Sequence, residues 1–243
     1  GTGIEDWSGG IGAGEPEACA HLATALAMRG IVTGVGGTTA SLSGMEHLVS
    51  HMFDMVNGEL HEPTGLHGAQ VGVGSVIRAA AWEVFCERQT KEGLDVDNLF
   101  GDIGAREEAV KARFEWLDAS GRIGEECWGR YRTKLTLWAS QRDRIKAAFG
   151  DWSALVTEHD RFVFGSHKIA LYLHRAGAPM RFSDLNPAPS AERLHWVVAN
   201  CQFMRERFTV ADLLTLAGWW DVVGVNRVLS RVDEACAAAE RSL

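Results

Sequence analysis

The chain has 243 residues, 24 lysines and arginines against 32 aspartates and glutamates, and 46% hydrophobic residues. This length is enough for one large domain or two small ones, with ample apolar side chains for a core. A net charge of −8 argues against a general binder of phosphate backbones, so no nucleic-acid partner is expected. The uninterrupted apolar runs are shorter than the roughly 20 residues of a membrane helix, so no membrane span is expected.

The cysteines are odd in number and widely separated, and they include no CxxC pair: Cys19, Cys86, Cys127, Cys201 and Cys236. This pattern indicates neither a disulfide framework nor a zinc ribbon, and a reducing cytoplasm is the expected compartment. The sequence begins Gly-Thr-Gly and shows no charged-then-apolar leader. A trimmed start methionine, a fragment and a processed chain all fit this beginning.

The first half of the sequence predicts two helices separated by glycine-rich segments. Residues 1–15 contain six glycines and little periodicity, which predicts a mobile lead-in. Pro16 suits the first turn of a helix, and apolar residues at helical spacing continue to Gly30. The segment IVTGVGGTTASLSG (31–44) is expected to interrupt this helix. A new helix is expected from near Ser43, with an apolar side formed by Met45, Leu48, Val49, Met52 and Phe53.

Helical spacing returns in four later segments, which are residues 67–88, 105–119, 125–149 and 152–175. Two further helix starts carry capping residues: Ser190 follows two prolines, and Thr209 with Asp212 resembles a capping box. Few runs alternate with period two, and strands and helices do not alternate regularly. The sequence therefore predicts a mostly α, multi-helix bundle of eight to ten helices over residues 16–243.

Four of the nine histidines lie within 21 residues: His47, His51, His61 and His67. Neutral imidazole is a common ligand of zinc and other borderline metals. His47 and His51 are four residues apart and share one face of a helix, which allows both to reach one ion. The alternative is one solvated and one hydrogen-bonded histidine. His67 lies between glycines in GLHGAQVGVG, which permits close approach of other segments, although a turn histidine before a packed helix is also consistent.

Three other patterns are less specific. GVGG (34–37) and GVGS (72–75) resemble parts of a dinucleotide-binding motif, but neither follows a strand. The tryptophans are expected in the core. Arg205, in RERF, belongs to a solvated helix end or faces an anion.

The segments SGMEHLVSHMFDM (43–55) and LHGAQVGVGSVI (66–77) resemble the paired signatures of the sn-glycerol-1-phosphate dehydrogenase family, within the iron/zinc alcohol dehydrogenase and dehydroquinate synthase-like superfamily. AGAPMRFSDL (176–185) and RERFTVADLL (205–214) are similar to late segments of the family, and the resemblance spans roughly residues 5–215. It implies the C-terminal helical, metal-binding domain of a two-domain enzyme whose N-terminal NAD- or NADP-binding domain is absent here.

The resemblance also implies a site. The family holds a divalent metal, usually zinc, by one aspartate and two histidines, which correspond to His47 and His67, with His51 nearby rather than a ligand. The metal polarises the substrate oxygen during hydride transfer. Glu5-Asp6-Trp7 resembles a stretch that follows the family's aspartate, so Asp6 is not its equivalent by register.

The expected substrate is a small phosphorylated polyol of phospholipid biosynthesis, although GGTTASLSG departs from the family's Ser-Arg-Pro-like loop. The expected partners are a nucleotide-binding domain and further copies of the chain in a homo-oligomer. No catalytic residue is assigned. The alternatives are a non-enzymatic helical module or remnant, acting as a ligand-binding or assembly subunit, and, ranked lower, a cyclase resembling dehydroquinate synthase.

Overall fold

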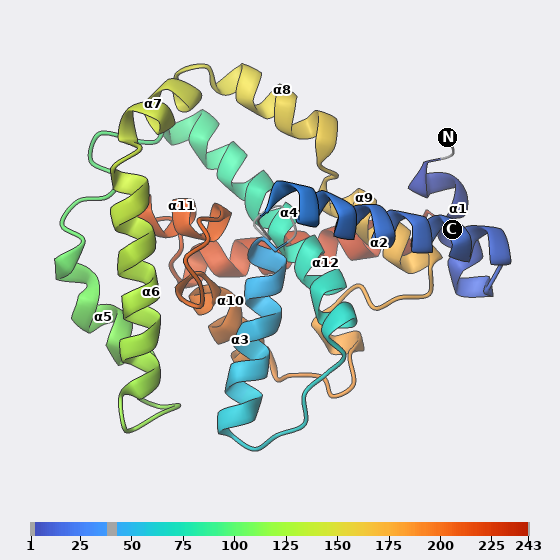
Figure 1. Cartoon of the computed structure of the whole chain (residues 1–243), viewed down its shortest axis with the longest axis horizontal. Coiled ribbons are helices and arrows are strands. Elements are labelled where there is room, and N and C mark those ends of the chain that lie inside the picture. Colours follow the sequence, from blue (N-terminus) through green and yellow to red (C-terminus); the bar gives the residue numbers. More distant parts are fainter. Residues whose placement is uncertain (1–2, 38–42, 243) are drawn as a thin grey trace.

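The computed structural model describes residues 3–37 and 43–242, and these ranges contain helices and turns but no strand. The mostly α prediction is confirmed. The α-helices are α1 (Ile4–Ala13), α2 (Pro16–Gly36), α3 (Met45–Glu59), α4 (His67–Glu92), α5 (Glu107–Ala112), α6 (Arg122–Ala139), α7 (Arg142–Gly150), α8 (Trp152–Phe162), α9 (Ser166–Arg175), α10 (Ala191–Asn200), α11 (Val210–Leu216) and α12 (Val222–Glu240). Figure 1 shows α4 running through the middle of the molecule, beside α3 and α12.

The predicted lead-in over residues 1–15 is wrong for most of its length, because α1 forms there. The Asp6 carboxylate accepts a hydrogen bond from the Gly3 backbone N–H at 3.0 Å and so caps the first turn. Gly12 faces α9 so closely that a Cβ would stand 2.9 Å from the Ala176 carbonyl group. The helix ends at Gly14, whose φ is 71°. Glycines that suggested a loop thus serve a helix–helix contact and a helix end.

α2 also extends further than expected, through residues 31–36 to Gly36. A Cβ on Gly30, Gly34 or Gly36 would meet no described atom within 4 Å. All three lie within α2, so these glycines do not mark a turn. Instead, the backbone leaves the helix at Gly37, where φ is 61°. The rest of the predicted interruption, residues 38–42, lies outside the described ranges.

α2 packs chiefly against α1, and it exposes large apolar side chains: Leu26, Met28, Ile31, Val32 and Val35. Within the described ranges it is the one helix with the length and mean hydropathy, 1.3, of a membrane span, and 6% of that stretch is buried. The expectation that the chain has no membrane span stays a prediction, because length and hydropathy of this kind are shared by helices that pack against protein.

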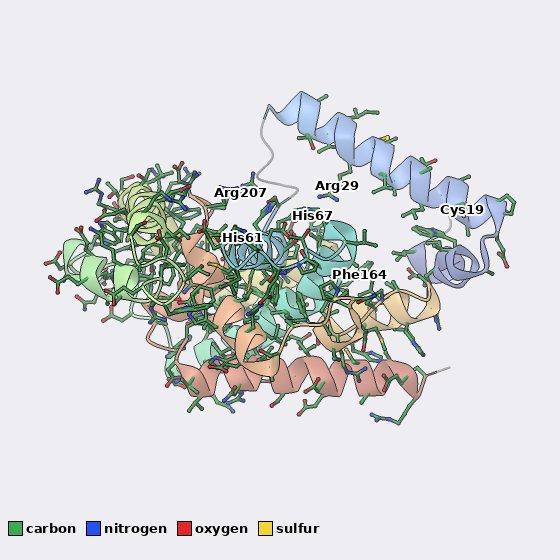
Figure 2. All side chains as sticks on the ribbon, turned by 90° about the horizontal axis from the view of Figure 1, so that it is seen from below. Cys19, Arg29, His61, His67, Phe164 and Arg207 are labelled. Atoms are coloured by element: carbon green, nitrogen blue, oxygen red, sulfur yellow. The ribbon has the colours of Figure 1, made fainter. Side chains whose placement is uncertain are left out.

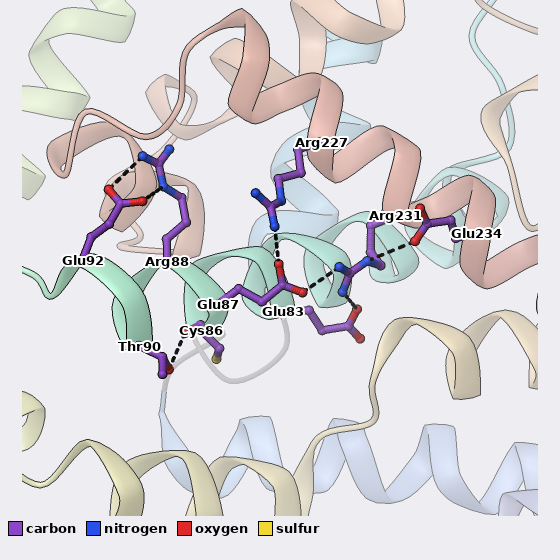
Figure 3. Close-up of polar contacts among 9 residues, drawn as sticks. All are labelled: Glu83, Cys86, Glu87, Arg88, Thr90, Glu92, Arg227, Arg231 and Glu234. Carbon is purple, nitrogen blue, oxygen red and sulfur yellow. Dashed lines mark hydrogen bonds and ion pairs between the residues drawn. The ribbon is translucent and has the colours of Figure 1, made fainter.

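The main core lies between α3, α4 and the helices that surround them. α3 begins beside Ser43 as predicted, and Leu48, Val49 and Met52 on its apolar side are completely buried. α12 covers α4 from the other side. There the two carboxylate oxygens of Glu87 form ion pairs with the guanidinium groups of Arg227 and Arg231, each at 2.6 Å (Figure 3). Because these ion pairs are partly exposed, apolar burial supplies most of the stabilisation between the two helices.

The later segments are helical but more divided than predicted. Residues 125–149 belong to α6 and α7, and residues 152–175 to α8 and α9, so the expected eight to ten helices are too few. Both capping predictions are confirmed. The Ser190 hydroxyl accepts the Arg193 backbone N–H at 3.1 Å, and the Asp212 carboxylate accepts the Thr209 backbone N–H at 2.7 Å. All five cysteines are free.

A buried ion pair anchors the segment between α10 and α11. Lys134 Nζ lies 2.6 Å from Asp212 Oδ1, and both side chains have no exposed surface. The ammonium also donates to the carbonyl oxygens of Gln202 and Arg207 at 2.5 and 3.2 Å. Burial raises the pKa of Asp212, and the Lys134 charge counteracts part of that rise. Lys134 therefore ties α6 to both ends of the segment that carries Arg205.

Lys134→Met is expected to lower the free energy of unfolding by about 3–5 kcal/mol, because it leaves the Asp212 carboxylate buried without its cation. Lys146→Met is the control, since Lys146 pairs with Asp97 at 2.6 Å while more than half of each side chain is exposed. We expect a loss of at most about 1 kcal/mol there. Urea unfolding followed by circular dichroism measures both, and equal losses would contradict the assigned role of Lys134.

Candidate metal centre

Three of the four clustered histidines converge where α3 and α4 meet. The ring centroids of His47 and His67 are 5.4 Å apart, those of His51 and His67 are 5.3 Å apart, and those of His47 and His51 are 6.3 Å apart. Two imidazoles on one tetrahedral zinc have centroids roughly 5 Å apart, given Zn–N bonds of about 2.0–2.1 Å. The spacing of both pairs that include His67 fits a shared ion. His61 is exposed at the end of α3, at φ 54°, and does not join the three rings.

The convergence depends on a close approach of the two helices. A Cβ on Gly74 would stand 2.7 Å from the backbone oxygen of Glu46 and 3.1 Å from its Cα. Only glycine fits at this point without displacing the backbone. Glu46 precedes His47, and Gly74 lies two helical turns after His67 on the same face of α4. The contact therefore sets the distance between the two histidines.

His47 is held at the first turn of α3 by its neighbour. Its Nδ1 lies 3.1 Å from Glu46 Oε1, which also accepts the Gly44 backbone N–H at 2.7 Å. A carboxylate on one imidazole nitrogen is the usual partner of a histidine that ligates metal through the other. The geometry leaves Nε2 of His47 for a ligand.

His51 and Asp54 lie one turn further along α3. Donor atoms of His51, Asp54 and His67 all fall within 4.8 Å of one another. Burial lowers the pKa of His51, and the positive Arg205 lowers it further, which favours the neutral imidazole that a metal requires. The structure therefore offers a carboxylate to the cluster that the resemblance did not assign.

His67 begins α4 and is exposed, and Figure 2 shows it on the side of the molecule over which α2 passes. Its Nδ1 lies 2.9 Å from the hydroxyl of Ser50, which in turn donates to Gln70 Oε1 at 2.6 Å. Ser50 and Gln70 were not anticipated from the sequence. The one available signal was their spacing, because each lies three residues after a clustered histidine and therefore on the same helix face.

A pocket of about 370 Å³ opens beside His51 and Asp54 and is lined by three arginines. Arg122 pairs with Glu59, and Arg130 with Glu126, each at 2.9 Å. Arg205, half-buried, forms no ion pair with any carboxylate in residues 3–37 and 43–242. The positive charge of Arg205 is thus available to an anion in the pocket.

The other sequence candidates lie elsewhere. GVGG and GVGS are parts of α2 and α4 rather than loops after strands, which removes the dinucleotide-binding interpretation of both. Asp6 caps α1. Trp128, Trp219 and Trp220 are buried, as expected of core tryptophans, whereas Trp116 is 53% exposed and packs edge-on against Trp196. Burial raises the pKa of Cys127, in the pocket wall, to about 12, so its thiol stays protonated and is a poor metal ligand.

Comparison with known proteins finds partial similarity to one kind of enzyme. The chain is 35% identical over 96 residues to glycerol-1-phosphate dehydrogenase [NAD(P)+] of Saccharolobus islandicus, a match covering 37% of this chain and 26% of that protein. The enzyme of the same name from Haloquadratum walsbyi is 32% identical over 102 residues, or 42% and 27% of the two chains. That of Methanococcus aeolicus is 41% identical over 59 residues, or 24% and 17%.

The matched part thus spans 17–27% of the length of these relatives. No protein-family profile matches the chain, and a search of solved structures finds no match. The similarity is therefore to one part of these enzymes.

Gly74→Ala is expected to cost about 1–3 kcal/mol in the free energy of unfolding, because the new methyl group meets the Glu46 backbone. Gly129→Ala is the matched control, since Gly129 also lies within a helix but a Cβ there meets nothing within 4 Å. That change should instead stabilise by roughly 0.5–1 kcal/mol. Thermal unfolding of both variants tests the contact, and stabilisation by Gly74→Ala would contradict it.

Proposed function

We propose that this chain supplies the helical, metal-binding part of an NAD(P)-dependent oxidoreductase of the glycerol-1-phosphate dehydrogenase kind. The observation that carries the proposal is the convergence of His47, His51 and His67 between α3 and α4. A bound divalent metal, zinc by donor chemistry, would polarise the substrate oxygen. The protein's own share is to hold the ligands rigidly and to leave one coordination position open to substrate.

Two ligand sets are consistent with the geometry, and His67 belongs to both. The family resemblance selects His47 and His67, whereas donor-atom distances select His51, Asp54 and His67. We propose His47 and His67 as ligands, because the Glu46 carboxylate on Nδ1 of His47 is the arrangement typical of a metal-binding histidine. In the described ranges, Asp54 lies within reach of His67 and His51, and we propose it as a carboxylate ligand only in the second set.

The pocket beside the histidines suits a small phosphorylated polyol. Arg205 presents a cation that pairs with no carboxylate among the described residues, and it lies close enough to His51 to lower the pKa of that imidazole. A phosphate on Arg205 would orient the other end of a short substrate toward the metal ligands. The relatives' names specify glycerol 1-phosphate as a substrate of those enzymes, and we infer a substrate of that class here.

The nicotinamide cofactor requires a further domain or polypeptide. The described residues contain no strand, so they provide no βαβ unit for a dinucleotide. Leu66, directly before His67, is 80% exposed and lies on the face of the candidate site. We propose that a nucleotide-binding domain covers this face and brings the nicotinamide to the metal. A cytoplasmic location fits the five free cysteines.

His67→Ala is expected to abolish stoichiometric zinc binding, because both ligand sets lose their shared member. His47→Ala should then weaken binding more than His51→Ala or Asp54→Asn does. Competition against a zinc chelator gives the affinities. His167→Ala, at an exposed position on α9, is the control and should leave the affinity unchanged. Retained zinc in His67→Ala would contradict the proposal, and a larger loss in His51→Ala than in His47→Ala would select the other ligand set.

Arg205→Met is expected to weaken binding of glycerol 1-phosphate by about 1.5–3 kcal/mol, or roughly tenfold to a hundredfold, because a charged hydrogen bond is lost. Arg130→Met, which removes an arginine already paired with Glu126, should have a smaller effect. Calorimetric titration of the zinc-loaded protein measures both. Equal affinities in the wild type and Arg205→Met would exclude Arg205 as the phosphate ligand.

A further inference from the structure

We propose that Ser50 and Gln70 are positioning residues that fix the tautomer of His67, so that its Nε2 carries the lone pair a metal needs. The inference rests on the proposed function in one respect only, namely that Nε2 of His67 is a metal ligand. Because His67 belongs to both candidate ligand sets, the assignment holds whichever set binds the ion.

The direction of the hydrogen bonds follows from their lengths. Ser50 Oγ and the Gln70 side-chain oxygen are 2.6 Å apart, a distance typical of O–H···O and shorter than the roughly 2.9 Å of an N–H···O bond. Gln70 therefore presents its oxygen to Ser50, and the serine hydroxyl donates. The Gln70 amide nitrogen is directed toward Gly65, 3.1 Å from where a Cβ on that glycine would stand. Because Gly65 has no side chain, there is room for the Gln70 amide group beside it.

The proton on His67 is then determined. A hydroxyl has one hydrogen, and Ser50 donates it to Gln70. In its 2.9 Å contact with His67 Nδ1, the serine oxygen therefore accepts the hydrogen bond. Nδ1 must carry the N–H. A neutral imidazole has only one N–H, which leaves Nε2 unprotonated. An unprotonated ring nitrogen is the form that binds a metal ion.

Burial makes the arrangement rigid. Ser50 is completely buried and Gln70 is 3% exposed, so water does not compete for either side chain. Ser50 lies on α3, one turn after His47, and Gln70 lies on α4, one turn after His67. Gly74 sets the spacing between these two helices. The reverse orientation of the Gln70 amide would turn the serine hydroxyl toward Nδ1 and place the proton on Nε2, which would prevent ligation there. The orientation of the Gln70 amide thus determines the direction of both hydrogen bonds, and Ser50 connects Gln70 to His67.

Long-range ¹H–¹⁵N spectra of the metal-free protein, labelled at histidine nitrogen, report the tautomer directly. The His67 signals are assigned by their loss in His67→Ala. We expect neutral His67 in the wild type to be the Nδ1–H form, and Ser50→Ala to lose that preference. Gln70→Glu, which keeps an oxygen acceptor, should retain the Nδ1–H form, whereas Gln70→Met should not.

Zinc affinity provides the second measurement. Ser50→Ala and Gln70→Met are expected to bind zinc about 10–100-fold more weakly, and Gln70→Glu within a few-fold of the wild type. Ser75→Ala is the matched control, because Ser75 lies on α4 and its hydroxyl donates to the carbonyl oxygen of Val71 in the same helix, at 2.9 Å. It should change neither the spectrum nor the affinity.

The outcomes separate this inference from the proposed function. An Nε2–H tautomer in the wild type, or unchanged tautomer and affinity in Ser50→Ala, overturns the assignment. The Nδ1–H tautomer in a wild-type protein that binds no zinc sustains the assignment and refutes the metal site. Should Ser50→Ala fail to fold by circular dichroism, the contrast between Gln70→Glu and Gln70→Met decides, and equal tautomers in those two overturn the inference.

Discussion

The close packing of α3 on α4 at Gly74 is the constraint on which the candidate site depends. With the backbone of Glu46 at the distance that only a missing side chain permits, the N-terminal parts of the two helices bring His47, His51 and His67 together. The contact lies in the core, where Leu48, Val49, Val73 and Val76 expose no surface. Apolar burial thus supplies the rigidity that a metal centre requires, and a glycine supplies the distance.

Hydrogen bonds around the rings complete what packing begins. Glu46 contacts Nδ1 of His47, and Ser50 contacts Nδ1 of His67, so Nε2 is the nitrogen left for a ligand in both imidazoles. Arg205 lies near His51, on the segment that Lys134 and Asp212 anchor. The proposed metal ligands and the proposed anion-binding arginine are therefore supported by separate structural features. This separation would let the proposed enzyme hold a metal and orient a charged substrate independently.

Much of the fold followed from sequence because the responsible signals are local. Ser190 and Thr209 with Asp212 marked helix starts through their own hydrogen bonds, and the apolar spacing from Met45 onward located α3. Glycine was the misleading residue. Gly12 permits α1 to touch α9, and Gly34 lies within α2, yet both look like loop residues when their neighbours in space are unknown. The glycines after His67 were different, because they indicated the close approach of another segment, and Gly74 makes that contact. At the site, the sequence indicated the clustered histidines, but the parts of Ser50, Gln70 and Asp54 depend on contacts between helices that no local pattern contains.

Crystals of the zinc-loaded protein, with anomalous scattering recorded at the zinc edge, test the central claim most directly. We predict one strong anomalous peak between α3 and α4, about 2.0–2.1 Å from Nε2 of His67, with His47 completing a histidine pair. Ligation of His67 through Nδ1 would refute the role given to Ser50. A zinc ion located away from His67 would refute the metal centre itself.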